Sequence, residues 1–376
     1  MSASARREDG FEVAAWIDAF GGFIARHKPL WIRIGNLETK LLADELETIP
    51  IEQPIYIAGL ARWGTTILLE ILSQHQDVVT HRYKDYPPIF TPVFWNGLLE
   101  RIPQRSIEPV ERTHRDGIMV TPDSPEALEE PLWMAFFSGL HDPQSSAVLD
   151  DRTANPAFEL FYRNHIRKLL RVRSGRRYVS KGNYNLTRLE YLLKLFPDAR
   201  FVVPIREPSS HIASLMKQHE LFAKGQSRSP RALEHMRRVG HFEFGLDRRP
   251  INAGDRSCIT KIAALWEQGN DVEAWSRYWN HIYGHVTERL DANPELRDAV
   301  VIMRFEDLCR SPREILRTIL DHCRLSASDP LVDQLSETIR VPTYDRRPFN
   351  QEELRTVHRR TAATAERFGY ESSQPA

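Results

Sequence analysis

The sequence has few cysteines, no excess of charge of either sign and no long apolar run, and each absence excludes a class of protein. Its cysteines, Cys258, Cys309 and Cys323, are odd in number and lack metal-ligand spacing. This argues against a disulfide framework and favours a reducing cytoplasm. Lys+Arg and Asp+Glu both total 51, so no overall charge attracts the chain to nucleic acid or to a membrane surface. Any site for a polyanion must be local.

A membrane-spanning segment is also missing from the sequence. No apolar run approaches the roughly 18 residues that such a helix needs. Early arginines precede residues 11–28, but Glu12 and Asp18 interrupt the apolar pattern there, so we expect neither a signal peptide nor a membrane span. Hydrophobic residues make up 41% of the 376 residues, which is enough for the core of a globular protein.

Neither a repeat of fixed period nor a low-complexity tract divides the chain, so we expect a single domain over residues 1–376. The predicted parts of this domain are a helical N-terminal extension (1–50), a core (54–325), a basic insert or lid within that core (223–256) and a C-terminal helical cap (326–376).

Short β-rich runs, each followed by a helical pattern, indicate the fold class. The runs are "PIYIAG" (54–59), "RRYVSK" (176–181), "RFVVPI" (200–205) and "AVVIMRF" (299–305). Alternation of strands and helices is typical of a mainly parallel sheet with helices on both faces. The sequence therefore predicts an α/β fold with a central parallel sheet.

The stretch "GLARWGTT" (59–66) joins the first predicted strand to a helix. Successive backbone N–H groups at a helix N-terminus favour a phosphate-like anion, and the hydroxyls of Thr65 and Thr66 add donors. A nucleoside-triphosphate loop of the G-x-x-x-x-G-K-[ST] type has lysine where this chain has Thr65. The cation available within this loop is Arg62.

This loop resembles the 5′-phosphosulfate loop of the sulfotransferases that use 3′-phosphoadenosine 5′-phosphosulfate (PAPS), whose pattern is roughly P-[KR]-S-G-T-T. The matching residues are Arg62, Gly64, Thr65 and Thr66, while Ala61 and Trp63 replace the usual proline and serine. The resemblance, closest to the bacterial-type branch, implies a P-loop-like three-layer fold. It also implies that residues 62–66 bind PAPS, and these residues are Arg62, Trp63, Gly64, Thr65 and Thr66.

A second motif follows the third predicted strand. Arg206 ends that strand and Ser214 lies eight residues later, so a fork of donors and a hydroxyl can reach one phosphate group. This arrangement is similar to the family's 3′-phosphate motif, R-[DE]-P followed by serine. Lys181 ends the preceding strand, and the family has a lysine there that contacts the bridging oxygen or the sulfuryl group.

The resemblance implies in-line transfer of a sulfuryl group from PAPS to a hydroxyl or amine, with Arg62 and Lys181 stabilising charge without a metal. Family members use histidine or glutamate as the general base. In "TPDSPEALEEPLWMAFF" (121–137), Ser124 and Pro125 predict a helix start. The candidate bases are Glu130 and Glu129 from this segment together with Asp85, and His81 ranks behind them.

Several alternatives remain open at the level of sequence. The chain can instead be a P-loop kinase using ATP and magnesium, or a nucleotide-binding scaffold without catalysis. The insert 223–256 is either a lid over adenine or acceptor, or a solvated basic surface. The late basic stretch 344–349 is a weak candidate for the 3′-phosphate. The expected partners are a small-molecule, carbohydrate or lipid acceptor and, from base rates, a second copy in a homodimer, but no nucleic acid and no membrane span.

Overall fold

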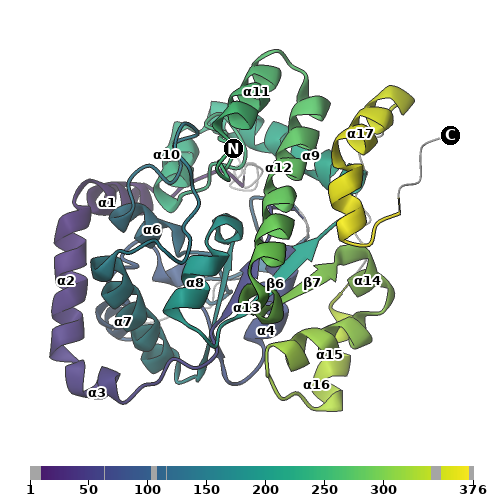
Figure 1. Cartoon of the computed structure of the whole chain (residues 1–376). Coiled ribbons are helices and arrows are strands. Elements are labelled where there is room, and N and C mark those ends of the chain that lie inside the picture. Colours follow the sequence, from purple (N-terminus) through teal and green to yellow (C-terminus); the bar gives the residue numbers. More distant parts are fainter. Residues whose placement is uncertain (1–9, 63, 103–107, 116, 340–348, 372–376) are drawn as a thin grey trace.

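The computed structural model describes residues 10–62, 64–102, 108–115, 117–339 and 349–371 (Figure 1). The strands are β1 (Ile55–Ala58), β2 (Val78–Val79), β3 (Val110–Glu111), β4 (Met119–Val120), β5 (Arg177–Gly182), β6 (Arg200–Ile205) and β7 (Val300–Arg304). Helices α1 to α9 are α1 (Ala15–Arg26), α2 (Lys28–Leu41), α3 (Ala43–Glu47), α4 (Thr65–Ser73), α5 (Pro92–Leu99), α6 (Glu130–Phe136), α7 (Pro156–Arg173), α8 (Leu189–Leu195) and α9 (Pro208–Arg228). Helices α10 to α17 are α10 (Pro230–Val239), α11 (Arg256–Glu267), α12 (Asp271–Ala292), α13 (Pro294–Ala299), α14 (Phe305–Arg310), α15 (Pro312–His322), α16 (Asp329–Glu337) and α17 (Gln351–Arg367). Short helical turns η2 (Tyr83–Asp85) and η3 (Tyr184–Thr187) complete the described elements.

The main sheet has the strand order β2-β5-β1-β6-β7, and neighbouring strands in it pair in parallel. Strand β1 lies at the centre, where Ile57 pairs with Lys181 on one side and with Val202 on the other. The predicted α/β fold with a parallel sheet is confirmed. Because the strands share one direction, their carboxyl ends meet at a single edge, which is where ligands bind in sheets of this kind.

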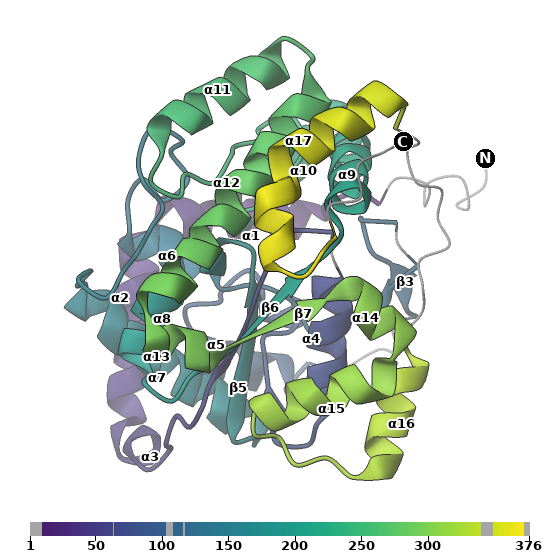
Figure 2. The same cartoon turned by 45° about the vertical axis from the view of Figure 1, so that its right-hand side comes forward.

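The central strand buries both of its faces, as its near-continuous apolar sequence predicts. Ile55 and Ile57 face a cluster that includes α4 and α15, whereas Tyr56 and Ala58 face a larger cluster that includes α8 and α12. Side chains alternate between the faces of a strand, so one short run supplies two core layers. Figures 1 and 2 show the resulting arrangement, in which helices cover the sheet on both sides.

The N-terminal helices α2 and α3 pack beside the core against α7. Glu38 of α2 and Lys168 of α7 form a buried ion pair with 3.0 Å between Oε2 and Nζ. Lys168 also donates a hydrogen bond to the carbonyl oxygen of Gly35, and the backbone N–H of Phe94 donates one to Glu38. This pair therefore connects α2, α5 and α7. None of the helices in the described ranges combines the length and apolar composition needed to cross a membrane.

Replacing Lys168 with methionine is expected to reduce the free energy of unfolding by about 3–5 kcal/mol, because it leaves the carboxylate of Glu38 buried without its counter-charge. Urea denaturation followed by circular dichroism measures the change. Arg171→Met is the matched control on the same helix. Arg171 pairs with Glu45 at the surface, where side-chain exposure is 34% and 57%, so its loss should cost less than about 1 kcal/mol. Equal losses in both variants would contradict the structural role of the buried pair.

Candidate active site

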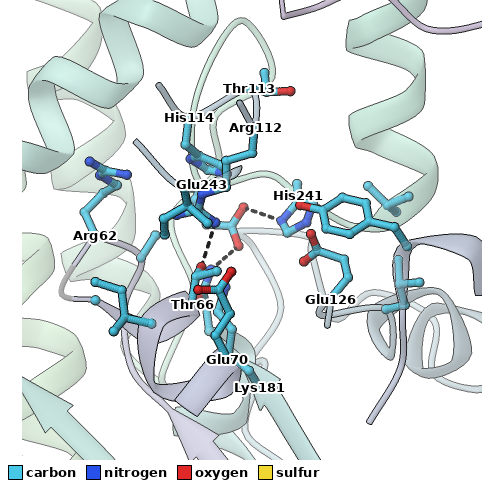
Figure 3. Close-up of a pocket in the computed structure, with 18 of the residues that line it drawn as sticks. Arg62, Thr66, Glu70, Arg112, Thr113, His114, Glu126, Lys181, His241 and Glu243 are labelled. Carbon is cyan, nitrogen blue, oxygen red and sulfur yellow. Dashed lines mark hydrogen bonds and ion pairs between the residues drawn. The ribbon is translucent and has the colours of Figure 1, made fainter. Parts of the chain in front are cut away.

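A cavity of about 850 Å³ opens at the carboxyl edge of the sheet (Figure 3). Its floor is built from strand ends that are far apart in the sequence. Gly64 and Thr66 follow β1, Lys181 ends β5, Arg206 follows β6 and Phe305 follows β7. The parallel sheet thus brings the predicted lysine and residues of both predicted phosphate motifs to one cavity, whose lining includes Arg62 and Arg206 but not Ser214.

The loop between β1 and α4 has an unusual backbone. Arg62 has φ of 74° and Gly64 has φ of 106°, both in the left-handed region. This region is unfavourable for a residue with a Cβ atom, so Arg62 carries local strain. A Cβ on Gly64 would also lie 3.1 Å from the ring of Phe305. The loop therefore needs glycine at position 64 and outside support at position 62.

That support comes from the segment after β6. Arg206 donates a hydrogen bond from Nη1 to the carbonyl oxygen of Arg62 at 3.3 Å, and Nε2 of His211 donates to that of Ala61 at 2.8 Å. The side chain of Arg62 reaches the hydroxyl of Ser214 at 3.4 Å. Burial lowers the pKa of His211 to about 3, so its ring is neutral and keeps the donating proton on Nε2. His211, a buried histidine on the helix after the motif, was not among the site residues expected from the sequence.

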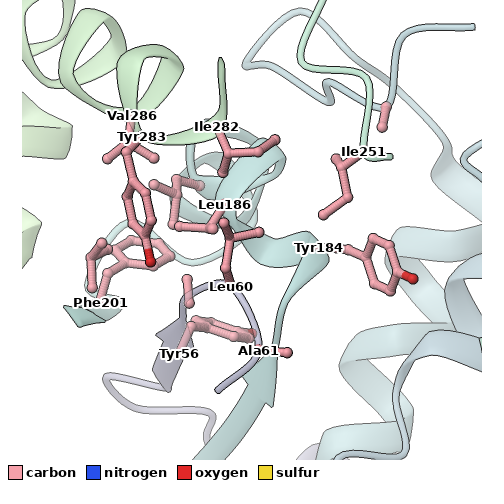
Figure 4. Close-up of a cluster of buried hydrophobic side chains, with 14 of the residues drawn as sticks. Tyr56, Leu60, Ala61, Tyr184, Leu186, Phe201, Ile251, Ile282, Tyr283 and Val286 are labelled. Atoms are coloured by element: carbon pink, nitrogen blue, oxygen red, sulfur yellow. The ribbon is translucent and has the colours of Figure 1, made fainter. Parts of the chain in front are cut away.

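Below the loop, apolar packing anchors the backbone. Leu60 and Ala61 are buried in the cluster that contains Tyr56 and Tyr283 (Figure 4). The loop therefore buries its apolar residues in the core while its later residues face the cavity.

Cations dominate one part of the cavity. Arg112, which follows β3, donates a hydrogen bond to the hydroxyl of Thr66 at 2.6 Å. Burial lowers the pKa of the neighbouring His114, and the charges of Arg112, Arg62 and Lys181 lower it further. The three cations around His114 give this part of the cavity a positive local potential, which suits a polyanion. Nothing in the sequence around Arg112 and His114 identified them, because their position depends on the β3–β4 hairpin.

Arg206 is suited to hold an anion. Its side chain is 2% exposed and lies over the ring of Phe305, 5.1 Å from the ring centroid. Its Nε has no hydrogen-bond partner among the described residues. A buried guanidinium with an unused donor is costly without a ligand, so this geometry fits a phosphate oxygen at the cavity floor.

Another part of the cavity carries carboxylates and a histidine. Glu126 lines it from the segment before α6, and His241 and Glu243 line it from the segment after α10. Burial alone would raise the pKa of Glu126, but Lys181 and a hydrogen bond from Tyr83 outweigh it and lower that pKa. The cavity therefore contains ionised acids as well as cations.

The part of the sequence that contains most of these residues matches a known protein family. The model of the sulfotransferase family matches residues 54–249, which is more than half of the chain. The chain belongs to the sulfotransferase family. No curated protein matches it.

Solved sulfotransferase structures resemble this sulfotransferase at low identity. STF1 from Mycobacterium tuberculosis H37Rv is 16% identical and aligns over 89% of this chain and 83% of that chain, with a TM-score of 0.48. STF9 from Mycobacterium avium is 15% identical over 89% and 82%, with a TM-score of 0.49. A sulfotransferase from Alicyclobacillus acidocaldarius is 15% identical over 86% and 98%, with a TM-score of 0.39.

The carboxylates expected to act as general base lie outside the cavity lining of this sulfotransferase. Glu129 accepts hydrogen bonds from the hydroxyls of Tyr162 and Tyr178, each at 2.5 Å. Glu130 pairs with Arg188 and His141 at 2.7 and 2.8 Å. These partners occupy both acids in structural contacts.

Asp85 is occupied in the same way. It pairs with Arg173 at 2.6 Å and accepts a hydrogen bond from Asn96, and it is 1% exposed. His81 lies beside it and is stacked on His165. Neither Asp85 nor His81 contributes to the cavity lining described for this sulfotransferase.

The helix expected from Pro125 begins only at Glu130. Residues 125–129 are therefore not helical, and Glu126 from this stretch lines the cavity. The backbone N–H of Glu126 donates to the carbonyl oxygen of His81 at 2.9 Å, which holds this non-helical stretch along the cavity wall. Trp63, the side chain of Thr65 and residues 344–348 of the late basic stretch lie outside the described part of the structure.

Glu130→Gln is expected to destabilise the fold by about 3–5 kcal/mol near neutral pH, because Arg188 is fully buried and loses its counter-charge. Burial would raise the pKa of Glu130, but Arg188 and His141 outweigh it and lower that pKa from 4.5 to about 2. A lowered pKa stabilises the fold above about 4.5, and this contribution is lost as the pH falls toward 2. The stability gap between wild type and variant should therefore shrink at about pH 3.

Urea denaturation at both pH values measures this gap. Glu234→Gln, which removes an exposed pair with Arg237, is the control and should change stability by less than about 1 kcal/mol. A Glu130→Gln variant as stable as wild type near neutral pH would contradict the structural assignment.

Proposed function

We propose that this sulfotransferase transfers a sulfuryl group from PAPS to a hydroxyl or amine of an acceptor. The observation that carries the proposal is the convergence of Arg62, Lys181 and Arg206 on one cavity at the carboxyl edge of the sheet. A cavity of about 850 Å³ is within the range of sites that enclose nucleotide-sized ligands.

In this proposal the loop after β1 holds the 5′-phosphosulfate. Its residues Arg62, Trp63, Gly64, Thr65 and Thr66 supply backbone N–H groups, hydroxyls and one guanidinium. Arg206 and Ser214 hold the 3′-phosphate, with the unused Nε of Arg206 as one donor. The hydrogen bond from Nε of Arg62 to the hydroxyl of Ser214, 3.4 Å long, brings the two motifs together and supports a common anion site.

Lys181 is proposed to stabilise the departing phosphate. As the acceptor oxygen or nitrogen bonds to sulfur, the bond between sulfur and the 5′-phosphate oxygen breaks and its electron pair stays on that oxygen. A preorganised ammonium and guanidinium stabilise this charge most strongly in a site that excludes water. The mechanism assigns this role to side chains and requires no metal.

The remaining features of the proposal concern the whole chain. We propose one functional domain over residues 1–376, with residues 223–256 closing over the cavity and a small-molecule, carbohydrate or lipid as acceptor. Met236, Val239, His241 and Phe244 of that insert contribute to the cavity lining, which supports a role for it at the site. A cytoplasmic location and a homodimer stay predictions.

Calorimetric titration distinguishes this proposal from a P-loop kinase. Adenosine 3′,5′-bisphosphate, ADP, and ATP with magnesium are titrated separately in phosphate-free buffer. We expect tight binding of the bisphosphate alone, because Thr65 replaces the kinase lysine and Arg206 with Ser214 requires a 3′-phosphate. Preference for ATP with magnesium would overturn the proposal in favour of a kinase.

Arg206→Ala is expected to weaken bisphosphate binding by about 1.5–3 kcal/mol, because it removes a charge-assisted contact in a buried site. This loss corresponds to an increase in Kd of about 10- to 150-fold. Arg310→Ala is the control, since Arg310 is 72% exposed and pairs only with Asp307 among the described ion pairs. Urea denaturation verifies that both variants are folded. Unchanged affinity in folded Arg206→Ala would remove Arg206 from the site.

A further inference from the structure

The cavity contains a histidine held by a buried carboxylate. His241 and Glu243 lie in the segment that follows α10, within the basic insert. Nδ1 of His241 lies 3.3 Å from Oε2 of Glu243, whose side chain is 8% exposed. In Figure 3, His241 and Glu126 lie to one side of the cavity and Arg62 to the other. The pair therefore faces the same space as the proposed sulfuryl donor.

Glu243 is itself fixed by the end of a sheet strand. Nδ2 of Asn183 donates a hydrogen bond to Oε1 of Glu243 at 2.6 Å. Asn183 is two residues beyond Lys181, so one strand end carries both the proposed charge-stabilising lysine and the residue that orients Glu243. The chain of contacts Asn183–Glu243–His241 thus sets the position of the imidazole relative to Lys181.

This geometry determines which ring nitrogen is available for chemistry. The neutral ring donates from Nδ1 to the Glu243 carboxylate, which leaves the lone pair on Nε2. No hydrogen bond from a described residue reaches Nε2. A carboxylate that orients an imidazole in this way is the arrangement by which enzymes prepare a histidine to accept a proton.

The groups around His241 adjust its proton affinity. Burial lowers the pKa of His241, but Glu243 and Glu126 outweigh burial and the charge of Lys181, so the pKa lies above its ordinary value of 6.5. His114 and His235 also face it, and burial lowers the pKa of both, so they are neutral. Lys181 and Tyr83 lower the pKa of Glu126 below its ordinary value of 4.5.

These directions distinguish the two candidate bases. A general base is most effective when its pKa lies near the working pH. Glu126 has a pKa below 4.5 and is a weak base, whereas His241 has a pKa above 6.5 and is the stronger base.

We propose that Nε2 of His241, oriented by Glu243, is the general base that accepts the proton of the acceptor. This inference rests on the proposed function. The acceptor oxygen or nitrogen passes its proton to Nε2 as its bond to sulfur forms, and His241 becomes an imidazolium. The sulfur–oxygen bond to the 5′-phosphate breaks, and its electron pair leaves with adenosine 3′,5′-bisphosphate. Glu243 is a positioning residue that stabilises the imidazolium.

The test measures release of adenosine 3′,5′-bisphosphate from PAPS, with water and with a panel of phenols, alcohols and amines as acceptors. His241→Gln should reduce kcat by about 10²–10⁴-fold with the best acceptor, since general-base catalysis contributes that much. Its Kd for adenosine 3′,5′-bisphosphate should stay within about twofold of wild type. His27→Gln is the control, because His27 is an exposed histidine outside the cavity lining, and it should keep the wild-type rate. Urea denaturation verifies that each variant is folded.

The pH dependence separates the proposed role from a structural one. Wild-type kcat should rise with pH through the pKa of His241, since only the neutral ring accepts a proton. Glu243→Gln removes a charge that favours the imidazolium, so this rising limb should move to lower pH while the maximal kcat falls. NMR titration of ¹³C-labelled histidine should show the same downward shift for the His241 signal.

Four results would overturn the inference. Folded His241→Gln with the wild-type rate would remove His241 from the chemistry, and loss of rate in Glu126→Gln alone would assign the base to Glu126. A wild type that binds the bisphosphate but does not release it from PAPS with water or with any acceptor of the panel would be a nucleotide-binding protein without catalysis. Failure of the wild type to bind the bisphosphate would instead refute the proposed function, and the inference with it.

Discussion

All strands of the main sheet run in one direction, so the chain leaves β1, β5, β6 and β7 at the same edge. The cavity depends on this constraint, because its floor consists of the residues that follow those strands. The loop after β1 adopts a strained left-handed backbone at Arg62, and hydrogen bonds from Arg206 and His211 to its carbonyl oxygens compensate. Arg206 therefore has two roles, since it supports the loop and also offers Nε to the cavity.

The charged residues of this sulfotransferase divide into two groups according to their partners. Glu129, Glu130 and Asp85 lie close in sequence to the cavity wall but have strong donors on every side, so their charge stabilises the packing of neighbouring helices. Glu126 and His241 instead line the cavity. A buried carboxylate that already accepts hydrogen bonds from arginine, tyrosine or histidine is poorly suited to accept a proton, whatever its position along the chain.

The cavity combines two kinds of chemistry that different parts of the fold supply. Strand ends and the β3–β4 hairpin carry the cations, while the basic insert (223–256) carries the imidazole. The sheet holds these cations in fixed positions, as binding of a multiply charged donor requires. The hydrogen bond from Asn183 to Glu243 links the insert to the end of β5, so the imidazole has a fixed position relative to the cations of the sheet.

The sequence by itself determined the fold class and the residues of the cavity floor. The sequence of β1 is apolar on both of its alternating faces, which requires helices on either side of the sheet. The motifs around Arg62 and Arg206 are local patterns that follow strand ends. Lys181 was predictable for the same reason. Each of these positions depends on contacts between residues near one another in sequence or on the common direction of the strands.

Only the tertiary structure decided which acids and histidines reach the cavity. Glu126 was not among the expected bases, and the helix expected from Pro125 begins only at Glu130, which leaves Glu126 in a non-helical stretch along the cavity wall. His241 and Glu243 are separated from Lys181 by about sixty residues, and no local pattern relates them. Their roles depend on which donors and carboxylates lie within about 3 Å of each side chain, a property of packing between distant segments that the order of residues does not display.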